Sequence, residues 1–175
     1  MSQPQPPPPG KLIVSVLTAD RDLLAPVAAD LSERFGPLDV CGPWWPFDFT
    51  RYYQKELGAP LERRMLSFKI LVPQGALAET KLHTNRLENR YGQNERRRVN
   101  LDPGLLTAER LVLATGKNFT HRIYLSKNIY GDLTLIYQRG RFQTLPWTYP
   151  DYSEEKMLAY LRRVRNKYGF DIKGH

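Results

Sequence analysis

The sequence predicts an α+β fold: a ferredoxin-like βαββαβ sandwich with a C-terminal β-hairpin and helix extension. A nearly continuous apolar stretch at residues 11–18, rich in β-branched side chains, is typical of a central strand buried on both faces. Apolar residues then recur at helical spacing over residues 23–35 and 74–91. The apolar strand precedes the first helix, two strand-like stretches separate the helices and one follows the second helix. This gives the order βαββαβ.

The composition fits one domain with a core of its own, because 41% of the 175 residues are hydrophobic. We expect this single α+β domain to span residues 11–170. Residues 1–10 are rich in Pro and Gln and are expected to form a disordered arm. Residues 171–175 are expected to be a flexible C-terminus.

The charge balance favours anionic partners. A net charge of +8 suits nucleotides, RNA or a membrane surface, although many basic proteins bind none of these. No apolar stretch approaches the length of a membrane span and no signal peptide is evident, so we expect no membrane association. The lone cysteine, Cys41, excludes an intrachain disulfide and a cysteine-based zinc cluster, which fits a cytoplasmic protein.

The N-terminal half begins with a strand and a helix. Asp20 is placed to cap this first helix, which Gly36 ends. A strand at residues 38–41 leads into an aromatic segment whose prolines, such as Pro46, favour a sheet edge or a loop. Residues 62–72 contain the next strand.

The second helix is expected at residues 74–91, before Gly92. His83 falls on its buried stripe, so we expect a hydrogen-bonded core histidine rather than a ligand. The inner face on a period of 3.6 consists of Ala76, Leu77, Thr80, His83, Thr84, Leu87 and Tyr91.

A basic stretch, residues 96–101, is expected to form the following strand and to end in a sharp turn at residues 102–104. Because side chains alternate across a strand, Arg98, Asn100 and Asp102 then share one face. One strand end would present a cation, an amide and a carboxylate together. The alternative is a solvated edge strand whose arginines oppose aggregation.

The C-terminal third is less regular. Residues 107–116 are expected to form a short helix, although Leu111-Val112-Leu113 fits a strand equally well. Residues 121–126 and 131–138 are expected to form a hairpin around the turn at Lys127 and Asn128.

An edge strand is expected at residues 141–145. The aromatic, proline-punctuated loop at residues 145–152 would cover either a core or a pocket. The final helix is expected to begin after its cap, Ser153, and to end at Gly169.

Four ordered signatures cover most of the chain. They are Pro46-Phe47-Asp48-Phe49-Thr50 with Tyr52-Tyr53, Arg98-Val99-Asn100-Leu101-Asp102-Pro103-Gly104, His121-Arg122-Ile123-Tyr124-Leu125, and Leu145-Pro146-Trp147-Thr148-Tyr149-Pro150-Asp151-Tyr152. Together they resemble an uncharacterised bacterial family, domain of unknown function 4416, from about Lys11 to Tyr168. The resemblance implies no established activity. His83 departs from it, because related sequences tend to be apolar there.

Some members of that family carry a GTP-binding label. This chain lacks the Gly-x-x-x-x-Gly-Lys-Ser/Thr pattern that cradles phosphates, so the label gains no support from its sequence.

The leading functional hypothesis is a module that binds a phosphate-bearing small molecule or nucleotide. Arg98 and Arg122 can contact phosphate with two parallel bonds, and Tyr124 and Tyr130 can stack or donate a hydroxyl. The alternative is cross-strand packing with surface ion pairs. The candidate ligand-binding residues are Arg98, Asn100, Asp102, His121, Arg122, Tyr124 and Tyr130.

Three other functions stay open. Asp48, Asp102 and His121 are candidate catalytic residues and candidate ligands for Mg²⁺ or Mn²⁺ in a metal-dependent hydrolase or phosphotransferase. The competing interpretation of Asp48 is a turn or helix cap. An RNA-binding sheet surface is a third function, although the aromatic signature of the RNA-recognition motif is missing. The fourth is an interaction protein without a ligand.

Overall fold

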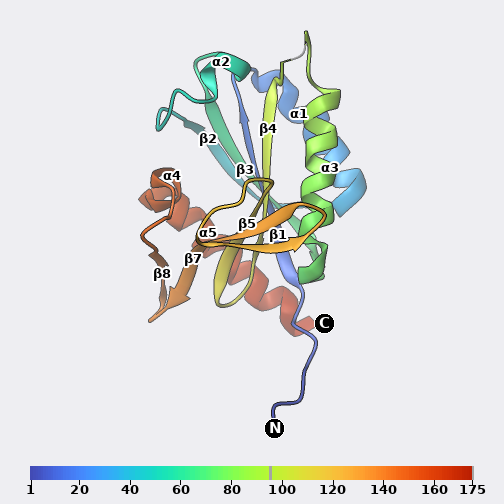
Figure 1. The fold of residues 1–175 in the computed structure, drawn as a ribbon, viewed down its shortest axis with the longest axis vertical. Coiled ribbons are helices and arrows are strands. Elements are labelled where there is room, and N and C mark those ends of the chain that lie inside the picture. Colours follow the sequence, from blue (N-terminus) through green and yellow to red (C-terminus); the bar gives the residue numbers. More distant parts are fainter. Residues whose placement is uncertain (95, 175) are drawn as a thin grey trace.

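The computed structural model describes residues 1–94 and 96–174 (Figure 1). In these residues eight strands form one antiparallel sheet. The strands are β1 (Gly10–Thr18), β2 (Leu38–Pro46), β3 (Glu62–Val72), β4 (Val99–Leu106), β5 (Arg110–Thr115), β6 (Arg122–Ser126), β7 (Ile129–Gln138) and β8 (Arg141–Thr144).

Helices connect and cover these strands. The α-helices of the described residues are α1 (Leu24–Phe35), α2 (Gln54–Leu57), α3 (Leu77–Arg90), α4 (Pro150–Ser153) and α5 (Glu155–Asp171). Short 3-10 helices lie at Arg21–Leu23, Gln74–Ala76 and Ile172–Gly174. None of these helices combines the length and the apolar character that crossing a membrane requires.

The strand order is β2-β3-β1-β4-β5-β7-β6, and β8 pairs with the remaining part of β7. A mixed architecture of helices on an antiparallel sheet is therefore confirmed. β2 lies at one end of the sheet, as its prolines predict, because proline cannot donate to a central ladder.

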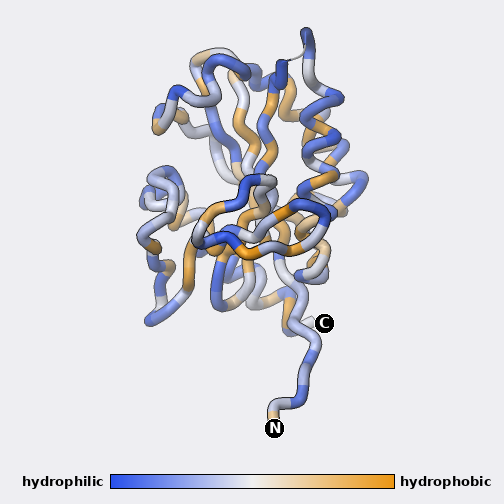
Figure 2. Tube along the Cα trace, viewed as in Figure 1, coloured by the Kyte–Doolittle hydropathy of each residue, from blue (hydrophilic) through white to orange (hydrophobic). Residues whose placement is uncertain are grey.

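The two faces of the sheet bury separate cores. On β1, Leu12 and Val14 belong to the core under α1 and α3, whereas Ile13 belongs to the core under α5. Figure 1 shows α1 and α3 together on one face. Alternating side chains explain why this strand reads as a continuous apolar stretch. Figure 2 shows hydrophobic residues along the central strands and hydrophilic residues along the outer turns of α3.

Several local predictions are confirmed. The carboxylate of Asp20 accepts a hydrogen bond from the Asp22 amide at the first helical turn. The hairpin of β6 and β7 turns at Lys127 and Asn128, whose φ angles of 51° and 62° are those of a turn that matches strand twist.

The predicted helix at residues 107–116 is wrong, because residues 110–115 form β5. Leu111 and Leu113 are 0% and 7% exposed, and their alternation places both in the core under α5. The Thr107 amide donates to the Arg110 carbonyl and closes a turn between β4 and β5. The periodicity of this stretch fits a helix and a strand equally well, and its pairing with β4 and β7 makes it a strand.

The predicted turn at residues 102–104 is also wrong, because these residues continue β4. Pro103 is opposite Val14 of β1, but by alternation its nitrogen faces away from β1, as the Leu101 amide does. On that side β5 pairs only from Gly104 onward, so the missing N–H costs no bond of the ladder. β5 approaches closely at Gly104, where a Cβ atom would lie 2.6 Å from Leu113 Cδ2 and 3.0 Å from the Val112 carbonyl oxygen, so a larger residue would displace this side chain and crowd the backbone of β5.

The final helix differs from its prediction at both ends. The hydroxyl of Ser153 donates to the Tyr149 carbonyl within α4 and does not cap α5. α5 continues through Gly169 to Asp171, whose carboxylate accepts a hydrogen bond from Lys11 on β1. This contact with the sheet stabilises the extra turn.

His83 is half-buried on α3 and its ring packs edge-on against Phe35, 5.3 Å between centroids. Its Nε2 atom is buried and has no hydrogen-bond partner among the described residues. The core position is thus as predicted, but the expected hydrogen bond at Nε2 is missing. Both rings line a groove of about 440 Å³ between α1 and α3.

Candidate anion-binding site

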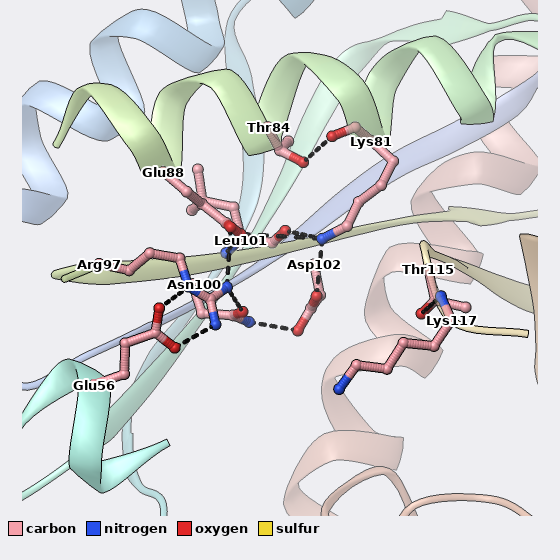
Figure 3. Close-up of polar contacts among 10 residues, drawn as sticks. All are labelled: Glu56, Lys81, Thr84, Glu88, Arg97, Asn100, Leu101, Asp102, Thr115 and Lys117. Atoms are coloured by element: carbon pink, nitrogen blue, oxygen red, sulfur yellow. Dashed lines mark hydrogen bonds and ion pairs between the residues drawn. The ribbon is translucent and has the colours of Figure 1, made fainter. Parts of the chain in front are cut away.

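One half of β4 lacks a neighbouring strand on its outer side. Residues 99–106 pair with β1, whereas β5 pairs only from Gly104 onward. At Leu101 the amide donates to Glu88 Oε1 at 2.6 Å, and the carbonyl accepts from Lys81 Nζ at 2.8 Å. Both side chains come from α3 (Figure 3). Helix side chains therefore satisfy backbone groups that would otherwise be left unpaired.

Arg97 connects α2, α3 and β4. Its Nε and Nη2 atoms donate to the two carboxylate oxygens of Glu56 at 2.6 and 2.7 Å. Its Nη1 donates to Glu88 and to Asn100, each at 3.0 Å. The bidentate bond lowers the pKa of Glu56 and raises that of Arg97. The guanidinium is held in one orientation.

Asp102 completes this network (Figure 3). It accepts from Asn100 Nδ2 at 2.6 Å and from Lys81 Nζ at 3.2 Å. Burial raises the pKa of this carboxyl, but Lys81 and the two hydrogen bonds outweigh burial and hold the pKa below its usual range. Burial raises the pKa of Glu88 despite Lys81 nearby.

Beside Asp102, a small group of polar side chains lies on the α5 side of the sheet, next to the apolar core. Ser15 is opposite Asp102 in the ladder, and Arg63 approaches from β3 to pair with Asp151. Three atoms here, Ser15 Oγ, Arg63 Nε and Tyr152 Oη, are buried without a hydrogen-bond partner among the described residues. All three residues are at least nine-tenths buried. These polar atoms belong to the core and do not reach solvent.

A groove opens between α2 and residues 93–94 and 96–98. Its volume is about 610 Å³. Arg98, at its edge, donates to Asp20 at 2.6 Å, and both side chains are more than one-third exposed. The described lining residues are Gln54, Lys55, Glu56, Leu57, Gly58, Gln93, Asn94, Arg96, Arg97 and Arg98. Four of these carry a positive charge and one carries a negative charge.

The other predicted site residues lie on or near the β6–β7 hairpin. Asp132 on β7 is 2% exposed, accepts from Arg122 Nε at 2.8 Å and lies 3.1 Å from His121 Nε2. Tyr124 and Tyr130 pack edge-on, with centroids 5.5 Å apart. No hydrogen bond or ion pair in the described part of the chain joins this group directly to Arg98, Asn100 or Asp102.

The structure does not bring the predicted metal ligands together. Asp48 is exposed in the loop after β2, Asp102 is bonded to Lys81, and His121 faces Asp132. Within residues 1–94 and 96–174, no group of three or more His, Cys, Asp or Glu side chains could hold a metal ion.

Sequence reasoning missed the residues that fix this network. Ser15 borders the network without bonding to it, and it had a signal because it is the one hydroxyl within the apolar stretch at residues 12–17. Lys81 and Glu88 had none, since charged residues on a helix usually face solvent. Only the fold shows that these two reach the unpaired side of β4.

This fold and site define a mixed α/β domain with a groove, lined mostly by cations, between α2 and the residues just before β4. The chain belongs to the family described as domain of unknown function (DUF4416), whose model matches residues 8–168. Comparison with curated proteins and with solved structures finds no match.

Proposed function

We propose that this protein binds a phosphate-bearing small molecule or nucleotide, and that the groove between α2 and residues 93–94 and 96–98 holds its phosphate groups. The observation that carries this proposal is the lining of the groove by Lys55, Arg96, Arg97 and Arg98. Guanidinium groups suit phosphate oxygens because they donate parallel hydrogen bonds and stay charged.

The groove contains one cation that carboxylates hold in place and one whose carboxylate partner a phosphate can replace. Arg97 is held by Glu56, Glu88 and Asn100, which take four of its five N–H donors, so it supplies a positive charge in a fixed place rather than a pair of parallel hydrogen bonds. Arg98 and its partner Asp20 are 43% and 37% exposed at their side chains. A surface pair of this kind is weak, so a phosphate can replace the carboxylate.

We also propose a finer description of the fold and its setting. Strands β1 to β4 in the order β2-β3-β1-β4, with α1 and α3 as crossovers on one face, support a ferredoxin-like sandwich. A single cysteine suits a reducing compartment and supports action in the bacterial cytoplasm.

Calorimetric titration with ATP, GTP, pyrophosphate and inorganic phosphate tests the binding. We expect saturable binding of at least one of them, weakened about tenfold or more by the double variant Lys55→Glu, Arg96→Glu. The matched control is the double variant Lys156→Glu, Arg163→Glu, which makes the same charge change at two exposed positions of α5. Binding by none of the four compounds, or equal affinities of the groove variant and the control, would overturn the proposal.

A separate measurement tests the alternative that the protein is an enzyme. Turnover of a bound nucleotide that Asp102→Asn abolishes, with the fold intact, would favour a hydrolase or phosphotransferase. Binding without turnover favours the binding module.

A further inference from the structure

Three loops carry exposed aromatic side chains next to cations. They are residues 50–53, residues 115–126 including β6, and residues 144–149. None of the three contains Asp or Glu, while Arg51, Lys117 and Arg122 are cationic. The exposed aromatic residues are Tyr52, Phe119, Tyr124, Trp147 and Tyr149. We call this surface the aromatic patch.

Direct contacts join the three loops into one surface. The Lys117 ammonium donates to the Tyr52 hydroxyl at 3.1 Å and lies 4.7 Å from the ring centroid. Arg122 donates to the hydroxyl of Tyr149. The rings of His121 and Trp147 stack, with centroids 4.9 Å apart and planes 11° apart.

The patch is held rigidly from beneath. Trp147 Nε1 donates to the Leu133 carbonyl at 2.8 Å, which fixes the indole against β7. His121 and Arg122 both face the buried carboxylate of Asp132. Tyr124 shares a strand face with Arg122 by alternation and packs on Tyr130. The rings are thereby oriented before any partner arrives.

Burial does not explain this concentration of aromatic surface. Phe119 is 62% exposed, Tyr124 is 56% exposed and Tyr52 is 63% exposed. Large exposed apolar surface in one place marks an interaction site. A partner must be able to stack on these rings and to lie against two exposed cations, Arg51 and Lys117, because Arg122 is already paired with Asp132.

We propose that the aromatic patch binds single-stranded nucleic acid, whose unpaired bases stack on Phe119, Tyr124 and Trp147 while its phosphates lie against Lys117 and Arg51. Stacking platforms interleaved with cations are the usual means of holding single strands without sequence preference. The patch shares no lining residue with the α2 groove, so this proposal does not depend on the proposed function.

Fluorescence anisotropy of labelled 12-nucleotide oligo(U) and oligo(dT) tests the proposal with the full chain. We expect saturable binding of one or both that weakens as salt rises. The double variant Phe119→Ala, Tyr124→Ala should bind at least about tenfold more weakly. Comparing the affinities for oligo(U) and oligo(dU), which differ only in the 2′-hydroxyl, shows whether that group contributes.

Phe170→Ala is the matched control, because Phe170 is an aromatic residue 74% exposed on α5 and lies outside the patch. It should bind as the wild type does. Phe119 and Tyr124 are exposed, so their removal should leave the melting temperature nearly unchanged. Quenching of Trp147 fluorescence by the oligonucleotide, lost in Trp147→Phe, gives a second measurement.

Three results would overturn the proposal. One is no saturable binding of either oligonucleotide at low salt. Another is affinity for a duplex equal to that for the single strand, because stacking requires unpaired bases. The third is wild-type affinity in the patch variant together with a loss in Lys55→Glu, Arg96→Glu, which would place the nucleic acid in the α2 groove.

Discussion

Ser15 and Thr18 occupy the same strand and differ in how their hydroxyl groups are satisfied. Both residues are 1% exposed. The Thr18 hydroxyl donates to the Arg98 carbonyl at 2.7 Å, whereas Ser15 Oγ has no hydrogen-bond partner among the described residues. A buried hydroxyl contributes to stability only through the bonds that it makes.

We therefore expect Thr18→Val to lower the free energy of unfolding by about 1 kcal/mol and Ser15→Ala to change it by less than about 0.5 kcal/mol. Urea denaturation followed by circular dichroism measures both. A loss in Ser15→Ala as large as that in Thr18→Val would contradict the structure at Ser15.

Asp102 links stability to pH. The Lys81 ammonium and hydrogen bonds from Lys81 and Asn100 outweigh burial, so the pKa of Asp102 is lower in the folded protein than the usual value of about 3.9 in the unfolded chain. A carboxyl with a depressed pKa stabilises the fold above its unfolded pKa, and that contribution is lost as pH falls through the folded pKa.

Asp102→Asn should accordingly cost about 2 kcal/mol at pH 7 and progressively less below about pH 4. Urea denaturation at several pH values measures the difference between wild type and variant. Asp48→Asn is the control, because Asp48 is exposed and forms no ion pair in the described part of the chain. A difference that stays constant from pH 7 to pH 3 would rule out the linkage.

At the scale of elements, side chains of α3 take the place of a neighbouring strand along part of β4. Lys81 and Glu88 lie on one side of the helix, two turns apart, and bond the carbonyl and the amide of Leu101. This arrangement occupies the strand edge that β5 leaves open, and so removes a template for pairing with another chain.

Amide hydrogen exchange at Leu101 tests this role. Glu88→Ala removes the acceptor, so the Leu101 amide should exchange about tenfold faster or more, relative to the amide of Leu17 on β1. Glu88→Gln keeps an oxygen at the same position and should retain most of the protection. Equal acceleration at Leu101 and Leu17 in Glu88→Ala would indicate general destabilisation and no local bond.

Local periodicity predicts most elements of this fold, and tertiary contacts decide the rest. β1, α1, α3 and the hairpin of β6 and β7 follow from apolar spacing and turn residues. β5 does not, because three consecutive apolar residues fit either structure. Residues 102–104 look like a turn, and only the missing neighbour of β4 explains how a proline fits inside a strand.

The candidate site shows the same limit. Sequence reasoning places Arg98, Asn100 and Asp102 on one strand, and the structure brings the latter two into one network. Sequence reasoning cannot add Glu56 to this network, because a contact between segments that are distant in the sequence produces no periodic pattern. Sequence reasoning groups the hairpin residues with those of β4 only because both sets lie in the four signatures. In the structure the hairpin residues form a separate cluster around Asp132.

At the scale of the whole molecule, a buried ion cluster attaches the C-terminal helix to the sheet. Lys11 at the start of β1 is 0% exposed and lies 2.6 Å from carboxylate oxygens of both Asp39 on β2 and Asp171 at the end of α5. Lys167 contacts the same two carboxylates from the surface, and its side chain is 37% exposed. Two lysines with the same partners thus differ mainly in burial.

Burial decides what each lysine contributes. Lys11→Met leaves two carboxylates close together without their buried counter-ion, so we expect a loss of about 3–5 kcal/mol and a clearly lower melting temperature. Lys167→Met removes an exposed pair and should cost less than about 1 kcal/mol. Adding Asp171→Asn to Lys11→Met relieves the repulsion and should restore part of the stability. Similar losses in both single variants, or no recovery in the double variant, would show that this cluster does not attach α5 to the sheet.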